Sequence, residues 1–290
     1  MSGGGETAPL GLVAGSGGLP VAAARAIADS GRRVVAVGFE GLTESGLESA
    51  VESFRWLRLG QLEALSEALR EMGARRLLLA GKVPKTLLFD GSGRVEPDPA
   101  AIALLSGVRD RGDEVLLGAL ADWLVARRFE LCAQDEVLRA MRAPRGRISR
   151  LPPDPRSLDD LSLGLPVLRA LGRVGVGQCV VLKDGAVLAV EAIEGTDEAI
   201  RRAGRLGGPG ATVIKAARPE QDRRFDLPVV GPDTIATLIE AGARALALEA
   251  GSVLLLDAER WVAEADEAGI AVWGFAGHEE DQDGEEEEAQ

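Results

Sequence analysis

Apolar residues in the first half of the chain form short runs separated by longer stretches with helical spacing. The runs at residues 10–14 and 34–38 flank a glycine turn and an alanine-rich segment that ends near Gly31. Two short strands on either side of a helix predict a βαβ unit with parallel strands. The same pattern continues with a helix at residues 61–72, a strand at 75–81, a helix at 112–128 and a strand at 129–133.

The second half repeats this alternation after a stretch of different composition. Residues 142–164 are rich in Pro, Arg and Ser and show no sustained periodicity, which indicates a linker. A short helix is expected at residues 166–171. Two apolar strands then flank Asp184 and Gly185, which both tolerate the positive φ of a tight hairpin turn. Strands and helices alternate from there to the end of the predicted fold.

Composition and charge agree with two globular α/β domains. The chain has 290 residues, 46% of them apolar, which is enough for two modest cores. Its formal net charge is -13, but eight carboxylates lie in the final segment HEEDQDGEEEEAQ. Such a run indicates a solvated, disordered tail, and no nucleic-acid-binding surface is expected. The predicted organisation is a Rossmann-like domain at residues 1–138, a linker at 139–164, a second α/β domain at 165–277 and the tail at 278–290.

Scarce residue types argue against several kinds of chemistry. The only histidine is His278 and tyrosine is absent, which disfavours zinc sites and Ser-His triads. Cys132 and Cys179 lie in apolar segments and are interpreted as buried thiols. Acid, base and metal-binding roles then fall to Asp, Glu and Lys, and the carboxylate oxygens of Asp and Glu favour Mg²⁺. No apolar run is long enough to span a membrane, so the protein is expected to be cytoplasmic.

The turn AGSGGLP lies between the first strand and the first helix. Glycines there let the backbone approach a diphosphate, and the helix N-terminus favours an anion. The candidate contacts are Gly15, Ser16, Gly17 and Gly18. A purely structural turn stays open as an alternative, because Pro20 replaces the last glycine of G-x-G-x-x-G. Lys82 and Lys85 follow the strand at residues 75–81 and are placed to neutralise the same anion, although either alone would be an ordinary surface lysine.

Charged residues gather at predicted strand ends in the second half. Thr196 and Asp197 begin a helix, where simple helix capping is the alternative interpretation. The whole group consists of Glu191, Glu194, Thr196, Asp197, Lys215, Asp222, Arg223, Arg224 and Asp226. Carboxylates with cations and no histidine suit phosphoryl transfer, in which acids hold Mg²⁺ and cationic side chains stabilise phosphate charge.

Several motifs together resemble one known family. They are GLVAGSGGLP, AGKVP, GQCVVLKDGAVLAVEAIEGTDEAI, RRFDLPVVGPDT and ALALEAGSVLLLD, spread over about residues 10–275. They are similar to motifs of the LpxI-type UDP-2,3-diacylglucosamine pyrophosphatases. The resemblance implies a two-domain hydrolase that cleaves UDP-2,3-diacylglucosamine to lipid X and UMP in lipid A biosynthesis. It also implies Mg²⁺ as cofactor and a location at the inner face of the cytoplasmic membrane.

The resemblance assigns a catalytic role to one residue, and the expected positions of the charged groups extend the assignment to others. Asp226 matches the essential aspartate of the family's D-L-P motif, and Arg223 or Arg224 is expected to face the diphosphate. The expected metal ligands are Asp226, Glu191 and Asp197. We expect the first domain, with Gly15 to Gly18 and Lys82, to hold the UDP part. The second domain is expected to hold the sugar phosphate and lipid through Glu191, Thr196, Asp197, Lys215 and Asp226.

The sequence also gives expectations for partners and leaves two other functions open. Reversible contact with the membrane surface is expected through the helix that carries Trp123 or through the stretch from Arg139 to Arg150. Homo-oligomerisation is left open. Two other functions also stay open: a Rossmann-type NAD(P)-dependent oxidoreductase, and a non-catalytic nucleotide-sugar binding protein in which Asp226 is dispensable.

Overall fold

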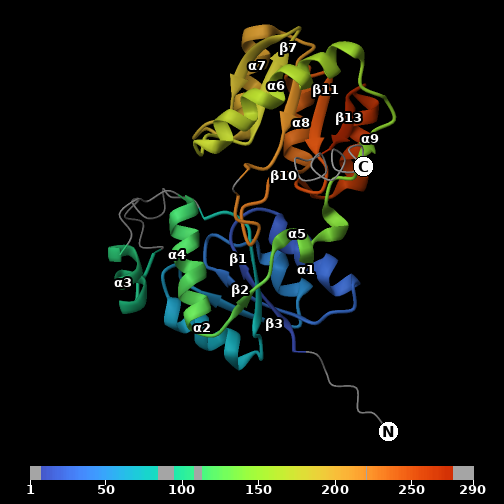
Figure 1. The fold of residues 1–290 in the computed structure, drawn as a ribbon. Helices are drawn as coiled ribbons and strands as arrows, with labels where there is room; N and C mark the ends of the chain where they lie inside the picture. The colour runs from blue at the N-terminus through green and yellow to red at the C-terminus, as the bar shows by residue number, and fades with distance from the viewer. Residues whose placement is uncertain (1–7, 84–94, 108–112, 220, 277–290) are drawn as a thin grey trace, which may run out of the picture. The chain divides into compact units, whose positions relative to one another are not determined.

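The chain forms two compact units, each built from helices and a sheet (Figure 1). The computed structural model describes residues 8–83, 95–107, 113–219 and 221–276. Unit 1 consists of Met1–Leu138 and Arg223–Asp226, and unit 2 of Arg139–Asp222 and Leu227–Gln290. The predicted fold class, two α/β domains with a parallel sheet in the first, is confirmed.

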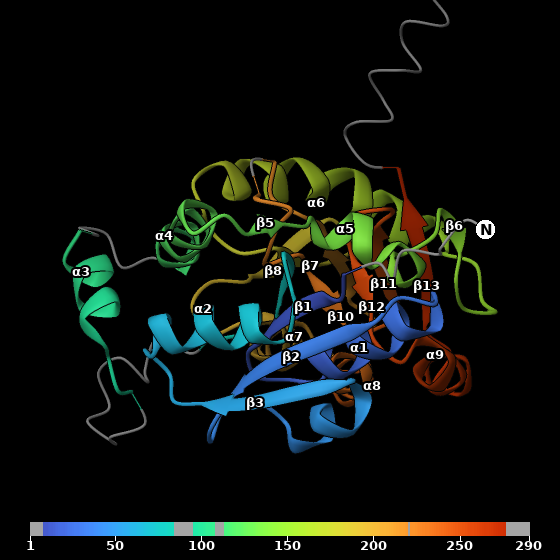
Figure 2. The same cartoon turned by 90° about the horizontal axis from the view of Figure 1, so that it is seen from below.

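Unit 1 is a five-stranded parallel sheet in the order β3-β2-β1-β4-β5. Figure 2 shows β2 and β3 running side by side at one edge. The strand order reverses between β1 and β4, which is where open α/β sheets bind ligands. The elements are β1 (Leu10–Ala14), α1 (Leu19–Asp29), β2 (Val34–Phe39), the 3-10 helix η1 (Ser45–Ala50), β3 (Ser53–Leu57), α2 (Leu62–Glu71), β4 (Arg76–Ala80), α3 (Pro99–Gly107), α4 (Asp113–Ala126), β5 (Glu130–Leu131) and α5 (Gln134–Val137).

The central strands of unit 1 are buried because helices cover the sheet. All residues of β1 and β2 are buried, as continuous apolar runs predict for a parallel sheet. Leu65 and Leu69 of α2 and Leu124 of α4 share one core with one residue of β1 and alternate residues of β2 and β4. Helix α1 packs on β1, β2 and β4. The carboxyl ends of these strands are thereby left to carry a site.

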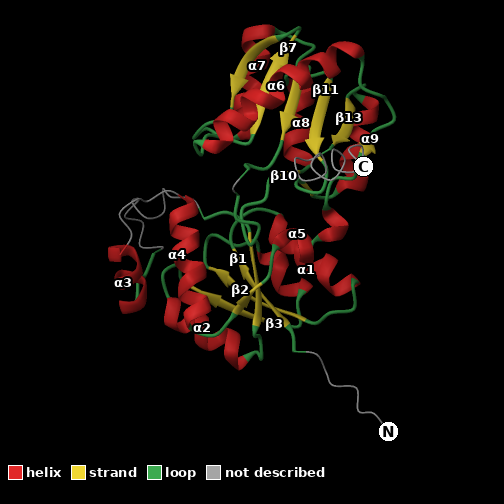
Figure 3. Cartoon of the chain, in the orientation of Figure 1, coloured by secondary structure: helices red, strands yellow, loops and turns green. Residues whose placement is uncertain are grey.

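Unit 2 contains a six-stranded mixed sheet in the order β6-β13-β11-β9-β7-β8 and a separate pair, β10 and β12. Figure 3 shows the strands with helices on both sides. Helices α7, α8 and α9 share a core around the fully buried Trp261, and α6 covers the other face through Leu168. The elements are the 3-10 helix η3 (Arg139–Met141), β6 (Gly146–Arg147), α6 (Pro155–Arg173), β7 (Cys179–Lys183), β8 (Ala186–Val190), α7 (Thr196–Gly207), β9 (Thr212–Lys215), β10 (Val229–Val230), α8 (Pro232–Glu240), β11 (Ala245–Glu249), β12 (Leu254–Leu255), α9 (Ala258–Glu267) and β13 (Ala271–Phe275).

The predicted linker at residues 139–164 is wrong. Strand β6 pairs with β13, and α6 begins at Pro155, well before the short helix that was expected. Asp154 caps α6 by accepting a hydrogen bond of 2.7 Å from the Ser157 amide. Proline fits the first turn because no N–H is needed there. Proline and serine therefore mark the start of a helix here, although a segment rich in these residues is also typical of a linker.

One further local prediction is confirmed, and two elements were not predicted. The hairpin is confirmed, with φ of 47° at Asp184 and 83° at Gly185 between β7 and β8. Strand β3 and helix α3 were not predicted; β3, at the sheet edge, mixes exposed and half-buried residues and lacks a continuous apolar run. Lys85, His278 and the acidic tail lie outside the described residues.

Candidate functional site

The glycine turn of unit 1 presents backbone to open space at the start of α1. Gly17 has φ of 86°, and a Cβ there would meet no atom within 4 Å. Gly18 is the N-cap residue, and no side chain caps the helix. Positive φ favours glycine, and an uncapped helix N-terminus carries N–H groups and partial positive charge. The turn is therefore suited to receive an anion, as its sequence predicts.

The turn is joined to the loop after β4 at the reversal point of the sheet. Ser16 and Lys82 form an isolated bridge, with N–O distances of 2.8 and 3.1 Å between their backbones. The Ser16 hydroxyl also donates to the Lys82 carbonyl at 2.9 Å. A Cβ at Gly15 would lie 2.6 Å from that carbonyl oxygen, so only glycine permits this approach. Ser16 and Lys82 are thus brought together, and the Lys82 side chain is exposed.

Residues 223–226, which we call the strap, belong to unit 1 although the chain on both sides belongs to unit 2. Phe225 is 4% exposed and lies in the core of unit 1. The backbone N–H of Gln134 donates to the Arg223 carbonyl at 2.7 Å, and Arg223 Nη1 donates to Asp135 Oδ2 at 2.9 Å. Asp226 was predicted in the second domain, whereas the contacts of residues 223–226 group it with unit 1. Burial of Phe225 and these polar contacts attach the segment to the first.

Asp226 is an exposed residue in the left-handed backbone region, with φ of 65°. Asp and Asn enter this region more readily than other residues with a Cβ, yet it remains uncommon and is enriched at functional sites. The neighbouring Arg224 guanidinium lies 5.7 Å from the centroid of the Phe225 ring. The carboxylate singled out by sequence thus lies on the surface of unit 1, next to a buried aromatic anchor.

In unit 2, three predicted residues form one hydrogen-bonded network. Lys215, at the end of β9, is 5% exposed and donates from Nζ to Thr196 Oγ1 at 2.7 Å. Thr196 Oγ1 donates to Glu191 Oε1 at 3.1 Å. The thiol of Cys179, paired in register with Lys215, is buried. Burial raises its pKa, the Glu191 carboxylate raises it further, and the Lys215 ammonium partly opposes them. Cys179 therefore stays a neutral thiol.

The other predicted acids of unit 2 have structural partners. Asp197 accepts a hydrogen bond from Thr234 at 3.1 Å, which ties α7 to α8, and Glu194 pairs with Arg202 at 2.6 Å. The N-cap of α7 is Gly195, without a side-chain cap, so Thr196 and Asp197 do not serve as the helix cap.

The expected metal ligands are divided between the two units. Glu191 and Asp197 are in unit 2, whereas Asp226 belongs to unit 1. Within the described ranges, no group of three His, Cys, Asp or Glu side chains is arranged to hold a metal ion. The residues that the structure describes therefore do not form a preassembled three-ligand site for Mg²⁺.

Sequence reasoning missed a buried ion pair at the end of β11. Glu249 is 3% exposed and its carboxylate pairs with Arg169 of α6. Glu249 Oε2 also accepts from the Ala217 amide at 2.9 Å. The pair therefore fixes the loop after β9, which leads to the strap. The signal was available as a single acid closing the apolar run ALALE.

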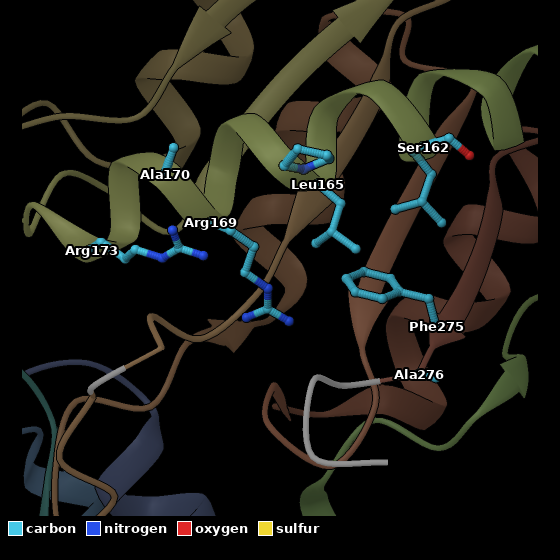
Figure 4. A pocket seen from close by; sticks show the side chains of 9 residues that line it. Ser162, Leu165, Arg169, Ala170, Arg173, Phe275 and Ala276 are labelled. Atoms are coloured by element: carbon cyan, nitrogen blue, oxygen red, sulfur yellow. The ribbon is translucent and has the colours of Figure 1, made fainter. Parts of the chain in front are cut away.

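A pocket of about 640 Å³ opens beside α6 in unit 2 (Figure 4). Leu165 and Phe275 point toward each other across it, and Arg169 and Arg173 lie farther along the helix. Among the described residues Arg173 has no hydrogen-bonding or ionic partner, and it is exposed. The volume falls within the range of about 300–1,000 Å³ that is typical of small-molecule sites. An apolar wall beside a guanidinium suits an amphiphilic anion.

Comparison with known proteins identifies the two halves separately. Residues 9–141 match the LpxI N-terminal domain, and residues 144–273 match the LpxI C-terminal domain. The boundary between these matches agrees with β6 and α6 belonging to unit 2.

One curated relative matches along nearly its whole length. It is the UDP-2,3-diacylglucosamine pyrophosphatase LpxI of Caulobacter vibrioides, 34% identical over 278 residues, which cover 91% of this chain and 96% of the relative. Two solved structures resemble the chain weakly. The biotin carboxylase domain of Hydrogenobacter thermophilus 2-oxoglutarate carboxylase has a TM-score of 0.25 at 12% identity, covering 62% of this chain and 35% of its own. N5-carboxyaminoimidazole ribonucleotide synthetase of Thermus thermophilus has 0.21 at 19%, covering 70% and 45%. The two domain matches and the curated relative together establish that this chain belongs to the LpxI family.

Proposed function

We propose that this protein hydrolyses the diphosphate bond of UDP-2,3-diacylglucosamine. Water supplies the oxygen that completes one phosphate, one P–O bond of the diphosphate breaks, and lipid X and UMP leave. The observation that carries this proposal is the 34% identity to the Caulobacter vibrioides pyrophosphatase over 91% of the chain. No feature of the described residues favours the oxidoreductase or the non-catalytic binding protein over this function.

The UDP part is proposed to bind at the carboxyl edge of the unit 1 sheet. Support comes from the uncapped α1 N-terminus, the open backbone at Gly17 and the exposed Lys82 at the reversal point between β1 and β4. Asp226 is proposed as the catalytic carboxylate that orients water or accepts its proton. Because the strap belongs to unit 1, this carboxylate is carried by the same unit as the nucleotide turn.

The sugar phosphate and acyl chains are proposed to bind to unit 2. Lys215 is held by Thr196 at the end of β9 and supplies a positive charge. The pocket beside α6 supplies apolar surface at Leu165 and Phe275 and a cation at Arg173. Each buried methylene of an acyl chain adds about 0.8 kcal/mol, so even part of a chain contributes substantially to recognition.

Dependence on Mg²⁺ is proposed from the chemistry of the substrate. Mg²⁺ commonly binds through one or two carboxylates together with substrate phosphates, so it does not require three preassembled protein ligands. The described residues contain no preassembled group of three His, Cys, Asp or Glu side chains, so the substrate phosphates would supply part of the ligand set.

Contact with a membrane surface is proposed for α3 and α4 of unit 1. The expected residue Trp123 is half-buried against the core, and the Arg127 guanidinium lies 3.5 Å from the centroid of its ring. Nearby apolar side chains are more exposed: Ile102 by 54% and Val125 by 49%. The stretch from Arg139 to Arg150 remains an electrostatic candidate. Among the described residues, no helix has the length and apolar character needed to cross a bilayer.

The direct test is release of UMP from UDP-2,3-diacylglucosamine by the purified protein. We expect turnover of this substrate and little turnover of UDP-glucose, which has the same nucleotide but no acyl chains. Equal turnover of the two would contradict the lipid assignment, and release of no UMP would contradict the reaction.

A further inference from the structure

We infer that Gln134 and Asp135 are positioning residues that hold the strap, and with it Asp226, at the carboxyl end of β4 in unit 1. The inference rests on the proposed catalytic role of Asp226. It adds that the position of this carboxylate is set by side chains of α5, which lie far from it in sequence.

Gln134 attaches the strap to the edge of the sheet. This residue is 2% exposed and makes contacts in two directions. Its backbone N–H donates to the Arg223 carbonyl at 2.7 Å, and its side-chain Nε2 donates to the Leu79 carbonyl at 2.7 Å. Leu79 is the second-last residue of β4. The strap is thereby fixed beside the strand that leads to Lys82.

Phe225 anchors the strap in the core. It lies with residues of β1, β2, β4, α2 and α4 in one cluster and is 4% exposed. Consecutive Cα atoms are about 3.8 Å apart, so anchoring Phe225 restricts Asp226 to a small region. Three residues farther on, Val229 begins strand β10 of unit 2. Asp226 thus directly precedes the point where the chain returns to the other unit.

Asp135 forms an ion pair with the strap that orients the strap more than it stabilises the fold. Its side chain is 9% exposed and pairs with Arg223, whose side chain is 44% exposed. The other oxygen, Asp135 Oδ1, is buried and has no hydrogen-bonding partner among the described residues. A half-satisfied buried carboxylate is a poor means of stabilising a fold. A role in fixing the direction of the strap accounts for its presence.

The backbone of Asp226 supports the same inference. A left-handed residue with a Cβ persists only when its surroundings determine it from both sides. On the N-terminal side of Asp226, Phe225 is buried and Arg223 is bonded to Gln134. On its C-terminal side, strand β10 pairs with β12. Loosening α5 is expected to release Asp226 from this conformation.

The test compares Asp135→Asn with Asp226→Asn in the full chain, using UDP-2,3-diacylglucosamine. We expect Asp135→Asn to lower kcat about 10- to 100-fold, as small misplacements of a catalytic group do, while KM changes less than about threefold. We expect the double variant to be no slower than Asp226→Asn alone. Amide hydrogen exchange at Phe225 should also accelerate in Asp135→Asn.

Asp160→Asn is the matched control. Asp160 is a fully buried carboxylate of unit 2 that pairs with Arg244 at 3.0 Å. Its substitution should lower thermal stability and leave the kcat of the folded protein unchanged. If Asp135→Asn does not fold, Phe225→Leu, which shortens the anchor, carries the same expectation.

Three outcomes would overturn the inference. Normal kcat in Asp135→Asn or Phe225→Leu, with Asp226→Asn inactive, would remove the positioning role alone. A change confined to KM or thermal stability would make these residues structural. Full activity of Asp226→Asn would remove the proposed catalytic role on which the inference rests. The Asp226→Asn variant by itself therefore distinguishes failure of the proposed function from failure of the positioning role.

Discussion

Arg223 donates a hydrogen bond of 2.9 Å to Asp135 across 88 positions of the sequence. Both residues belong to unit 1, whereas Asp222 and Leu227, on either side of the strap, belong to unit 2. The chain therefore passes between the units at residues 138, 222 and 226. Asp226, the proposed catalytic carboxylate, lies in the second half of the sequence but belongs to unit 1.

Asp226→Asn should lower kcat by about 10²–10⁴-fold with little change in KM, as expected when a general base is removed. Asn is the informative replacement because it tolerates φ of 65°, whereas Ala adds backbone strain of about 1 kcal/mol. Steady-state kinetics and thermal melts of both variants separate chemistry from folding. An active Asp226→Asn with an inactive, less stable Asp226→Ala would show that the backbone conformation matters and the carboxylate does not.

Gly17→Ala should weaken UDP binding about tenfold or more, the loss expected for one hydrogen bond to a charged group. Gly31→Ala is its control at the other end of α1, since φ is 86° at Gly17 and 79° at Gly31 and neither Cβ would meet an atom within 4 Å. Both variants should lose similar stability, about 1 kcal/mol. Calorimetric titration with UDP gives the comparison, and equal affinities would place the nucleotide elsewhere.

Leu165→Gln should raise KM for UDP-2,3-diacylglucosamine about 10- to 100-fold, because a buried leucine contributes about 1.5–3 kcal/mol. Leu163 lies on the same helix, is 54% exposed and does not line the pocket, so Leu163→Gln is the control. UMP affinity should be unchanged in both. A KM that rises equally in the two variants would exclude the pocket as the acyl site.

Excess chelator should abolish UMP release if the diphosphate binds together with Mg²⁺, and added Mg²⁺ should restore it. The physical reason is the charge that develops on the phosphate oxygens, which Lys and Arg side chains alone would otherwise have to stabilise. Full turnover in chelator would remove the metal from the reaction.

Flotation with vesicles should distinguish the two proposed membrane contacts. Ile102→Glu should weaken binding at any salt concentration if α3 inserts apolar side chains. Loss of binding only as salt rises, with Ile102→Glu unaffected, would instead assign contact to charges such as those between Arg139 and Arg150. Absence of binding at low salt would contradict both.

Local patterns in the sequence were sufficient for much of unit 1. Leu10–Ala14 and Val34–Phe39 are continuous apolar runs, and such runs form central parallel strands because both faces are covered. The AGSGGLP turn and the Asp184-Gly185 hairpin were predictable because positive φ restricts residue choice at single positions. In unit 2 the clustering followed from the places of Glu191 and Lys215 at strand ends and of Thr196 at the start of α7.

Only the tertiary structure decided which unit holds Asp226. Its neighbours Phe225 and Leu227 are both buried and apolar, and nothing in the sequence distinguishes the core that each residue enters. Gln134 and Asp135 have no local role that would mark them, since their contacts with Leu79 and Arg223 span 55 and 88 positions. The sequence by itself determined the residue types of the site and the strands that carry them. Long-range burial and hydrogen bonding decided where the strap attaches, because these free energies depend on partners that local periodicity does not contain.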